Sequence, residues 1–188
     1  MIVKVPISPN DEKFIELLLY IARRSEDDRK FGATKLNNLM FYSDFYAYQL
    51  TGKSITGHTY KKLPNGPVPK AMVPILKKLK LSGAIREEQR QHFARVQNRV
   101  VALREPDVTL FSATEISLVD SVMSELKDSN ATDVSDGSHQ FIGWKAAALG
   151  EDIPYQTALI SGEPEATEAD IAFAESLKVE AARVLAGR

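Results

Sequence analysis

The pattern of apolar positions near the start of the chain predicts a buried helix. Asn10 or Asp11 can cap this helix, which extends to about Arg24. Its apolar residues, between Phe14 and Ala22, cover much more than one face. A helix that is apolar over so wide an arc is expected to be sandwiched between other elements.

A second helix carries aromatic residues on two sides. Thr34 can cap it, and Gly52 ends it. At about 100° per residue, its apolar side chains fall on two nearly opposite faces, so we expect the helix to be central. Asp44 lies near the boundary between the faces, where its carboxylate is either exposed at a seam or buried and hydrogen-bonded. The faces comprise Leu36, Leu39, Met40, Tyr42, Tyr46 and Leu50 on one side, and Phe41, Phe45 and Tyr48 on the other.

The next segment predicts short extended stretches and turns. Residues 54–62 favour a bent or bulged strand, because a glycine interrupts β-favouring residues. The Asn-Gly-Pro sequence at 65–67 predicts a turn. Pro69 fits the first position of a third helix, which ends near Leu81, and Pro74 either starts or kinks that helix.

The second half of the chain predicts a hairpin followed by helices. Residues 84–88 and 95–104 resemble two strands joined by a polar turn. Ser112 and Glu115 form a capping-box pattern that opens a helix to about Lys127.

After a polar loop expected at 129–136, Ser135 or Ser138 can cap a helix that includes Trp144 and ends at Gly150.

A linker at 161–165 is expected to lead to a final helix from Thr167 to about Ala186, with a narrow, Ala-rich apolar stripe. These elements predict a mainly helical α+β fold with a small antiparallel sheet or hairpin. We expect one domain over residues 1–160, with a linker and an amphipathic helix at 161–188.

Composition is that of an ordinary globular protein, with 188 residues, 44% hydrophobic and 26% charged. The chain has no cysteine, which excludes disulfides and a thiol nucleophile. Its longest apolar run, residues 17–22, is too short to cross a bilayer, and residues 1–20 lack the features of a signal peptide. We therefore expect a soluble cytoplasmic protein that does not enter membranes.

Charge is unevenly distributed along the chain. Residues 61–104 contain 11 Lys and Arg against Glu87 and Glu88, a net of +9, so the rest sums to −10 within a total of −1. The basic block either attracts an acidic partner or nucleic acid, or forms a solvated surface balanced by the protein's own acidic tail. The candidate basic patch comprises Lys61, Lys62, Lys70, Lys77, Lys78, Arg95 and Arg99.

The order of three helices followed by a two-stranded hairpin is that of a winged helix-turn-helix. In such a module the third helix enters a major groove and the hairpin contacts phosphates. DNA binding through residues 61–104 is therefore an alternative function.

Catalytic and metal-binding patterns are weak. Asp136, Ser138 and His139 have the residue types of a hydrolase triad, but they lie within four positions, and a capped helix start explains them without catalysis. His58 and His92 share no metal-ligand spacing with His139. The sequence thus predicts no catalytic residue, metal or cofactor. The aromatic residues around Phe41 form core or line a partner groove.

An ordered series of short motifs between Lys13 and Tyr155 resembles the Panacea domain, the SocA-like antitoxin domain of bacterial and prophage toxin–antitoxin systems. The motifs are Lys35, Leu36, Leu39, Phe41, Tyr42, Asp44, Phe45 and Tyr46; Thr56, Gly57, Thr59 and Tyr60; Gly66, Pro67, Val68 and Pro69; Ser138 and His139; Trp144; and Ile153, Pro154 and Tyr155.

The resemblance implies an antitoxin that binds a cognate protein toxin and has no enzymatic activity. It also implies further partners in some members, either a Clp-type protease that receives the toxin or DNA; a homodimer is another alternative. The implied partner-binding or family-motif residues are Lys35, Tyr42, Asp44, Tyr46, Thr56, Gly57, Tyr60, Gly66, Pro67, Pro69, His139, Trp144 and Tyr155.

Overall fold

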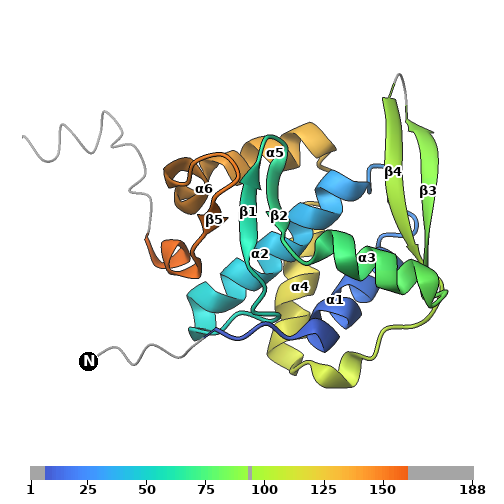
Figure 1. Cartoon of the computed structure of the whole chain (residues 1–188), viewed down its shortest axis with the longest axis horizontal. Helices are drawn as coiled ribbons and strands as arrows, with labels where there is room; N and C mark the ends of the chain where they lie inside the picture. Colours follow the sequence, from blue (N-terminus) through green and yellow to red (C-terminus); the bar gives the residue numbers. More distant parts are fainter. Residues whose placement is uncertain (1–6, 93–94, 161–188) are drawn as a thin grey trace, which may run out of the picture.

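A computed structural model describes residues 7–92 and 95–160 of the chain (Figure 1). The sequence also predicts a short edge strand at residues 1–5, from a weak alternation of apolar residues. That strand and the linker and helix expected at 161–188 lie outside the described residues. Within the described residues the predicted class is confirmed, because helices pack around two small antiparallel sheets in a mainly helical α+β fold.

Helix α1 (Asp11–Arg24) forms where the sequence predicts it. The Asn10 side chain accepts a hydrogen bond from the backbone N–H of Lys13 and caps the helix. The helix is buried on most sides, with Phe14 and the run from Leu17 to Leu19 fully inaccessible to solvent.

Helix α2 (Ala33–Thr51) is buried on two faces, as expected. The prediction that Thr34 caps it is wrong, because the helix begins after Gly32, which makes no side-chain cap. Its end is confirmed: Gly52 adopts a left-handed conformation with φ of 74°, which glycine tolerates best.

A three-stranded antiparallel sheet has the order β2–β1–β5, from β1 (Tyr60–Leu63), β2 (Gly66–Pro69) and β5 (Asp152–Ile153). The predicted strand at 54–62 is too long at its start, and the Gly-Pro-Val-Pro motif forms a strand rather than a turn and a helix start. Prolines are tolerated in β2 because it is an edge strand, whose outer side has no ladder partner.

Helix α3 (Met72–Leu81) precedes the long hairpin of β3 (Ile85–His92) and β4 (Arg95–Ala102). Pro74 lies in the first turn of α3, where its missing N–H costs no helical hydrogen bond, so the helix starts near the proline. The hairpin is confirmed.

The remaining helices follow the hairpin. They are the 3₁₀ helix η1 (Val108–Leu110), α4 (Ala113–Glu125), α5 (Ala131–Gln140), α6 (Ile142–Ala146) and the 3₁₀ helix η2 (Tyr155–Leu159). The capping box of α4 is confirmed. The loop predicted at 129–136 is wrong, because Asn130 caps α5 and forms a second capping box with Asp133.

Helix α2 crosses the middle of the molecule (Figure 1). It packs against α1, α4, α5, β2, β4 and η2, so it connects elements from both halves of the described chain. Among the described helices, none combines the length and hydropathy needed to cross a bilayer.

Candidate functional site

A buried carboxylate joins three of the predicted motifs. Asp44 on α2 is completely buried. Its Oδ1 accepts a hydrogen bond from the Thr56 backbone N–H at 2.7 Å, and its Oδ2 accepts bonds from the hydroxyls of Thr56 and, at 2.8 Å, Tyr60. The Tyr155 hydroxyl donates to the His58 carbonyl at 2.7 Å. We call Asp44, Thr56, Tyr60 and Tyr155 the Asp44 cluster.

Electrostatics in the Asp44 cluster favour hydrogen bonding rather than proton transfer. Burial raises the pKa of Asp44, and hydrogen bonds from Thr56 and Tyr60 partly offset that increase. Burial, followed by the nearby negative charge of Asp44, raises the pKa of Tyr60 and of Tyr155 far above the ordinary value. Both hydroxyls therefore stay protonated as donors.

Gly57 holds the neighbouring loop in place. It has φ of 70°, and a Cβ atom there would lie 2.3 Å from the Ser8 carbonyl oxygen. The Asn10 N–H donates to the Thr56 carbonyl at 2.8 Å, which joins this loop to the start of α1. Because every member of the Asp44 cluster is buried, the cluster stabilises the fold and offers no surface to a partner.

Two basic residues of the predicted site, Lys35 of the family motif and Arg99 of the basic patch, are buried. The Lys35 Nζ contacts Asp28 Oδ2 at 2.8 Å, the Lys127 carbonyl at 2.9 Å and the Ser129 carbonyl at 3.0 Å. Arg99 was expected in the basic patch, but it is only 2% exposed.

Arg99 is not part of a surface patch because its side chain points toward the end of α1. Its guanidinium donates to the carbonyls of Ser25 and Glu26 and, at 2.6 Å, to that of Asp28. Burial lowers the pKa of Arg99 despite neighbouring carboxylates. Free backbone carbonyls after a helix are acceptors that a five-donor guanidinium satisfies well, and no sequence pattern reveals their position.

A partly exposed stack of two aromatic rings lies where β1 meets α5 and α6. The rings of His139 and Trp144 stack with centroids 3.8 Å apart and an angle of 17° between their planes. The Lys62 Nζ lies 3.9 Å from the Trp144 ring centroid and donates to the Ala147 carbonyl at 2.9 Å.

An exposed leucine lies near this stack. Leu149 precedes Gly150, whose N–H donates to the Lys62 carbonyl at 2.8 Å, and its side chain is 66% exposed. Leu63 is 37% exposed, but it directly follows Lys62 in β1, so its side chain points to the opposite face of the strand. We call the set of Lys62, His139, Trp144 and Leu149 the Trp144 face.

The hairpin glycine of the family motif explains how α5 comes close to this sheet. A Cβ atom on Gly66 would lie 2.9 Å from Ser138 Oγ and about as close to the Asn38 side chain. Pro67 and Pro69, in the same strand, are buried. These motif residues thus act through packing.

The residues whose types resemble a hydrolase triad do not form one, in agreement with their close spacing in the sequence. His139 lies in the last turn of α5 rather than in a first turn, and its Nε2 is 3.3 Å from Ser135 Oγ. Ser138 is fully buried and donates to the Ser135 carbonyl. Among the described residues, His139 has no carboxylate within ion-pair distance, and no cluster of acidic or histidine side chains is placed to hold a metal ion.

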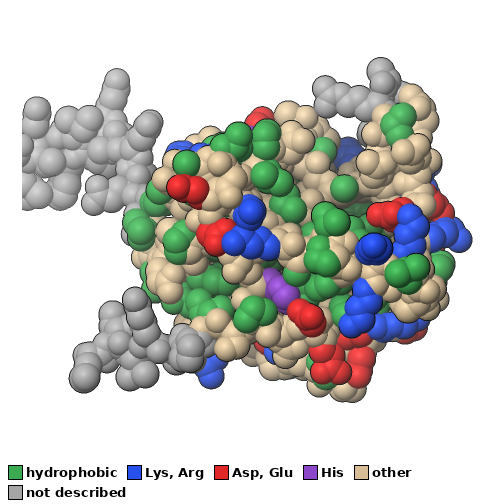
Figure 2. All heavy atoms as spheres, in the orientation of Figure 1, with side chains coloured by type: hydrophobic (Ala, Val, Ile, Leu, Met, Phe, Trp, Pro, Cys, Tyr) green, Lys and Arg blue, Asp and Glu red, His purple; other side chains and the backbone are tan. Residues whose placement is uncertain are grey.

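The structure divides the rest of the predicted patch, because Lys61 and Lys62 lie in β1 and Lys70 follows β2, whereas Lys77 and Lys78 lie on α3. Figure 2 shows blue side chains over α3 and the β3–β4 hairpin, with red and green side chains among them. Lys77 and Lys78 are exposed, whereas Lys70 pairs with Asp152 at 2.7 Å and Lys61 is half-buried. The side chain of Arg95 is not among those that the structure describes.

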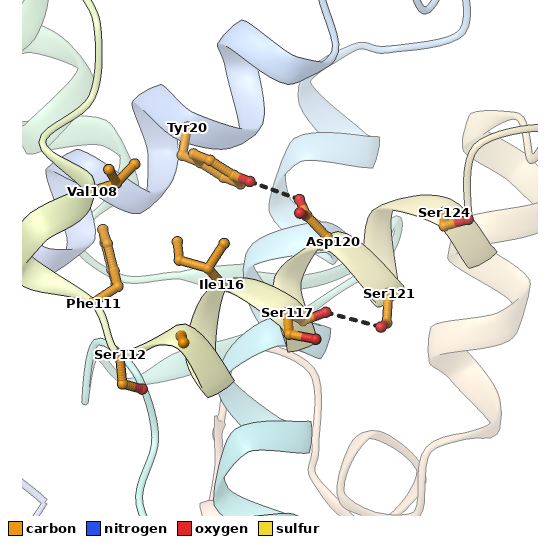
Figure 3. A pocket seen from close by; sticks show the side chains of 10 residues that line it. Tyr20, Val108, Phe111, Ser112, Ile116, Ser117, Asp120, Ser121 and Ser124 are labelled. Atoms are coloured by element: carbon orange, nitrogen blue, oxygen red, sulfur yellow. Dashed lines mark hydrogen bonds between the residues drawn. The ribbon is translucent and has the colours of Figure 1, made fainter.

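An open hollow of about 840 Å³ between α1, η1 and α4 was not predicted (Figure 3). The Tyr20 hydroxyl donates to Asp120 Oδ1 at 2.7 Å across it. Burial and this carboxylate raise the pKa of Tyr20 to about 12. Because its only ionisable lining residues are bonded to each other, the hollow shows no acid–base pair free to act on a ligand.

Tyr42 and Tyr46 lie on the side of α2 that packs against α4 and α5. Both are half-buried, and their ring centroids are 5.4 Å apart. Burial raises the pKa of each hydroxyl, with a contribution from Glu125.

Comparison with known proteins identifies the family. No curated protein and no solved structure matches the chain. The family model described as "Antitoxin SocA-like, Panacea domain" matches residues 36–145, more than half of the chain. The matched region includes α2, both hairpins, Gly66, His139 and Trp144. The chain therefore belongs to the SocA-like antitoxin family with a Panacea domain.

Proposed function

We propose that this chain neutralises a cognate protein toxin by binding to it directly. The observation that supports this proposal most is the family match over residues 36–145, which indicates an antitoxin role. The family also suggests a regulatory protein rather than an enzyme.

The Trp144 face is our candidate for the toxin-binding surface. Interface hot spots are enriched in Trp, Tyr and Arg, and are surrounded by contacts that exclude water. Trp144 is half-buried and held between neighbours, so it enters an interface with little loss of side-chain entropy. Leu149 supplies exposed apolar area near it, and Lys62 supplies a positive charge.

Co-expression with the product of the adjacent reading frame tests the proposal. If that product arrests growth, this chain should restore growth and co-purify with it. Trp144→Ala should abolish rescue, whereas Leu50→Ala, a matched change at a 70% exposed leucine outside the face, should not. Failure of the intact chain to rescue or to form a complex contradicts the proposed function. If Trp144→Ala remains fully active, the assigned surface is wrong.

The same strains separate two ways of neutralising a toxin. If the chain blocks the toxin sterically, toxin levels stay constant and rescue persists in cells that lack Clp-type proteases. If it delivers the toxin to such a protease, toxin levels fall only when the protease is present.

DNA binding is the second candidate function. It is supported by the exposed Lys77 and Lys78 of α3, just before a hairpin that carries further basic residues. Binding to its own promoter should weaken steeply with salt, because neutralised phosphates release counterions. Replacing Lys77 and Lys78 with Gln should lower affinity in a gel shift, whereas Arg99→Gln tests stability instead. Promoter binding unchanged in the double variant contradicts an α3 contact.

A further inference from the structure

Helix α3 presents an apolar stripe to solvent. Val73 is 75% exposed and Leu81 is 81% exposed, which makes them the two most exposed large hydrophobic side chains of the described residues. At about 100° per residue they lie roughly 80° apart around the helix, with Lys77 between them. The opposite side of α3, with Met72, Ile75 and Leu79, is buried. The stripe is therefore a stable surface rather than the result of a loosely packed helix.

Positive charge surrounds this stripe. Lys77 and Lys78 are exposed, and no described acidic group lies within ion-pair distance of either. Lys80, at the edge, pairs with Glu87 at 2.6 Å. On the adjoining strand β3, Arg86 and Arg90 share one carboxylate, that of Glu88. Lys77, Lys78, Lys80, Arg86 and Arg90 thus outnumber Glu87 and Glu88 on α3 and β3, while Asp11 and Glu12 line a hollow with Lys78 on the α1 side. Figure 2 shows blue side chains over α3 and the hairpin, with red ones among them.

The chain itself contains a segment of complementary chemistry. Residues 163–180 carry six acidic residues against the single Lys178. Apolar residues recur among them at helical spacing. The acidic residues are Glu163, Glu165, Glu168, Asp170, Glu175 and Glu180; the apolar ones, continuing beyond this range, are Ile171, Ala174, Leu177, Ala181, Val184 and Leu185.

We propose that the acidic segment at residues 163–186 binds the α3 stripe of the same chain, with its apolar residues against Val73 and Leu81 and its carboxylates near Lys77 and Lys78. The proposal goes beyond toxin neutralisation and does not depend on it. It assigns a partner to a surface that is both apolar and positively charged.

The chain is long enough for this contact. If the helix expected from Thr167 forms, the seven positions from Ile160 to Thr167 span about 23 Å when extended, and the thirteen helical positions on to Glu180 add about 20 Å, a reach of roughly 43 Å. A domain of this size has a radius of gyration of about 16 Å, so the later acidic residues can reach α3 from η2. The earlier ones, Glu163 and Glu165, are too close to Ile160 to take part.

The expected contact is weak but well populated. Exposed ion pairs contribute little singly, and salt screens them. Covalent linkage, however, gives the tail an effective concentration on the order of mM at its own α3, so a low intrinsic affinity is sufficient. An acidic partner of α3, whether protein or nucleic acid, must then displace the tail.

Zero-length carbodiimide crosslinking of the full chain tests the proposal. Equal amounts of unlabelled and ¹⁵N-labelled protein are mixed before crosslinking, and the linked peptides are identified by mass spectrometry. We expect links from Lys77 or Lys78 to Glu175 or Glu180, within single copies. Their yield should fall about five-fold between roughly 20 mM and 500 mM salt. Links only between differently labelled copies, or mainly to Lys53 beyond the end of α2, overturn the proposal.

A second measurement requires no crosslinker. Six substitutions of Glu to Gln or Asp to Asn at 163–180 leave the described core untouched. In methyl NMR spectra, the signals of Val73 and Leu81 should shift between wild type and this variant, while those of the exposed Leu50 should not. Unchanged Val73 and Leu81 signals overturn the proposal, as does an equal change at Leu50.

Discussion

The Asp44 cluster and the Trp144 face use neighbouring residues of one strand for opposite purposes. Tyr60 of β1 is fully buried and donates to a buried carboxylate, whereas Lys62, two positions later, places its ammonium over a half-exposed indole. Both regions are built from aromatic and charged side chains. The two regions differ in their access to solvent. The Asp44 cluster is buried and hydrogen-bonded internally, whereas the Trp144 face is partly exposed. Residues two positions apart in one strand can therefore be enclosed in the core or left accessible to solvent, and burial distinguishes the two environments.

Asp44→Ala should have the largest effect, on stability. The change leaves the Thr56 N–H and the Tyr60 hydroxyl without their buried acceptor and opens a cavity. We expect a loss of about 3–4 kcal/mol in the free energy of unfolding, measured by urea titration. Asp136→Ala, at an exposed position of α5, is the matched control and should cost less than about 0.5 kcal/mol. If both variants lose the same free energy of unfolding, the claim that the buried Asp44 cluster stabilises the fold is wrong.

Gly57→Ala should also destabilise the sealed region. The new Cβ atom would meet the Ser8 carbonyl at 2.3 Å, in addition to the strain of a left-handed conformation. Gly52→Ala isolates that strain, because Gly52 has a similar φ of 74° but no neighbour within 4 Å of an added Cβ. We expect about 1 kcal/mol for Gly52→Ala and roughly 2–3 kcal/mol for Gly57→Ala by thermal unfolding. A Gly57 variant no worse than the Gly52 variant would contradict the close approach.

Trp144→Ala should mainly affect binding. Loss of a central aromatic anchor typically costs about 2 kcal/mol, or roughly 30-fold in toxin affinity by calorimetry. His139→Phe keeps a flat ring beside Trp144 but cannot transfer protons, so it should bind normally. Loss of activity in His139→Phe with retained toxin binding would instead indicate acid–base chemistry at this histidine.

Lys62→Met should give a smaller change in the same region. It keeps an unbranched side chain across the indole but removes the ammonium, at a cost of about 1 kcal/mol in toxin affinity. Lys53→Met, at an exposed lysine, is the control and should leave affinity unchanged. If the loss of toxin affinity in Lys62→Met is the same in high salt as in low salt, the charge of Lys62 does not contribute to binding.

The pH dependence of stability offers the finest test of the sealed region. Because burial raises the pKa of Asp44 above its ordinary 3.8, the folded state holds this proton more tightly than the unfolded state. The contribution of Asp44 to stability is therefore fully present at low pH. It declines as pH rises from 3.8 through the folded-state pKa. Relative to Asp44→Asn, the wild type should lose stability with rising pH across that window, measured by urea unfolding. An opposite slope would show that the hydrogen bonds outweigh burial.

Local signals predicted much of the fold. Asn10, Gly52 and the Ser112–Glu115 pair mark helix ends through bonds that depend only on nearby residues, and each acts as predicted. The start of α5 was missed because its capping box uses Asp133 at the third helical position, where Glu or Gln is the usual signal.

Tertiary contacts account for the rest. Nothing near Arg99 in the sequence shows that its guanidinium reaches the carbonyls of Ser25 and Asp28, more than seventy positions away. The packing of the Trp144 ring, on α6, between His139 of α5 and Lys62 of β1 likewise depends on how β5 returns to pair with β1. The motif series identified the family, but burial alone shows which of its residues are open to a partner.

The short connection between α1 and α2 has a practical consequence for protein engineering. The Arg99 guanidinium donates hydrogen bonds to the carbonyls of Ser25, Glu26 and Asp28. The Lys35 ammonium bonds both the Asp28 carboxylate and the carbonyl of Lys127, which lies just after α4. In the printed sequence this polar stretch resembles an ideal site for an epitope tag or a fluorescent label. The connection links α1, α2, the β3–β4 hairpin and the end of α4 through these hydrogen bonds. An insertion there would therefore weaken the packing of all four elements.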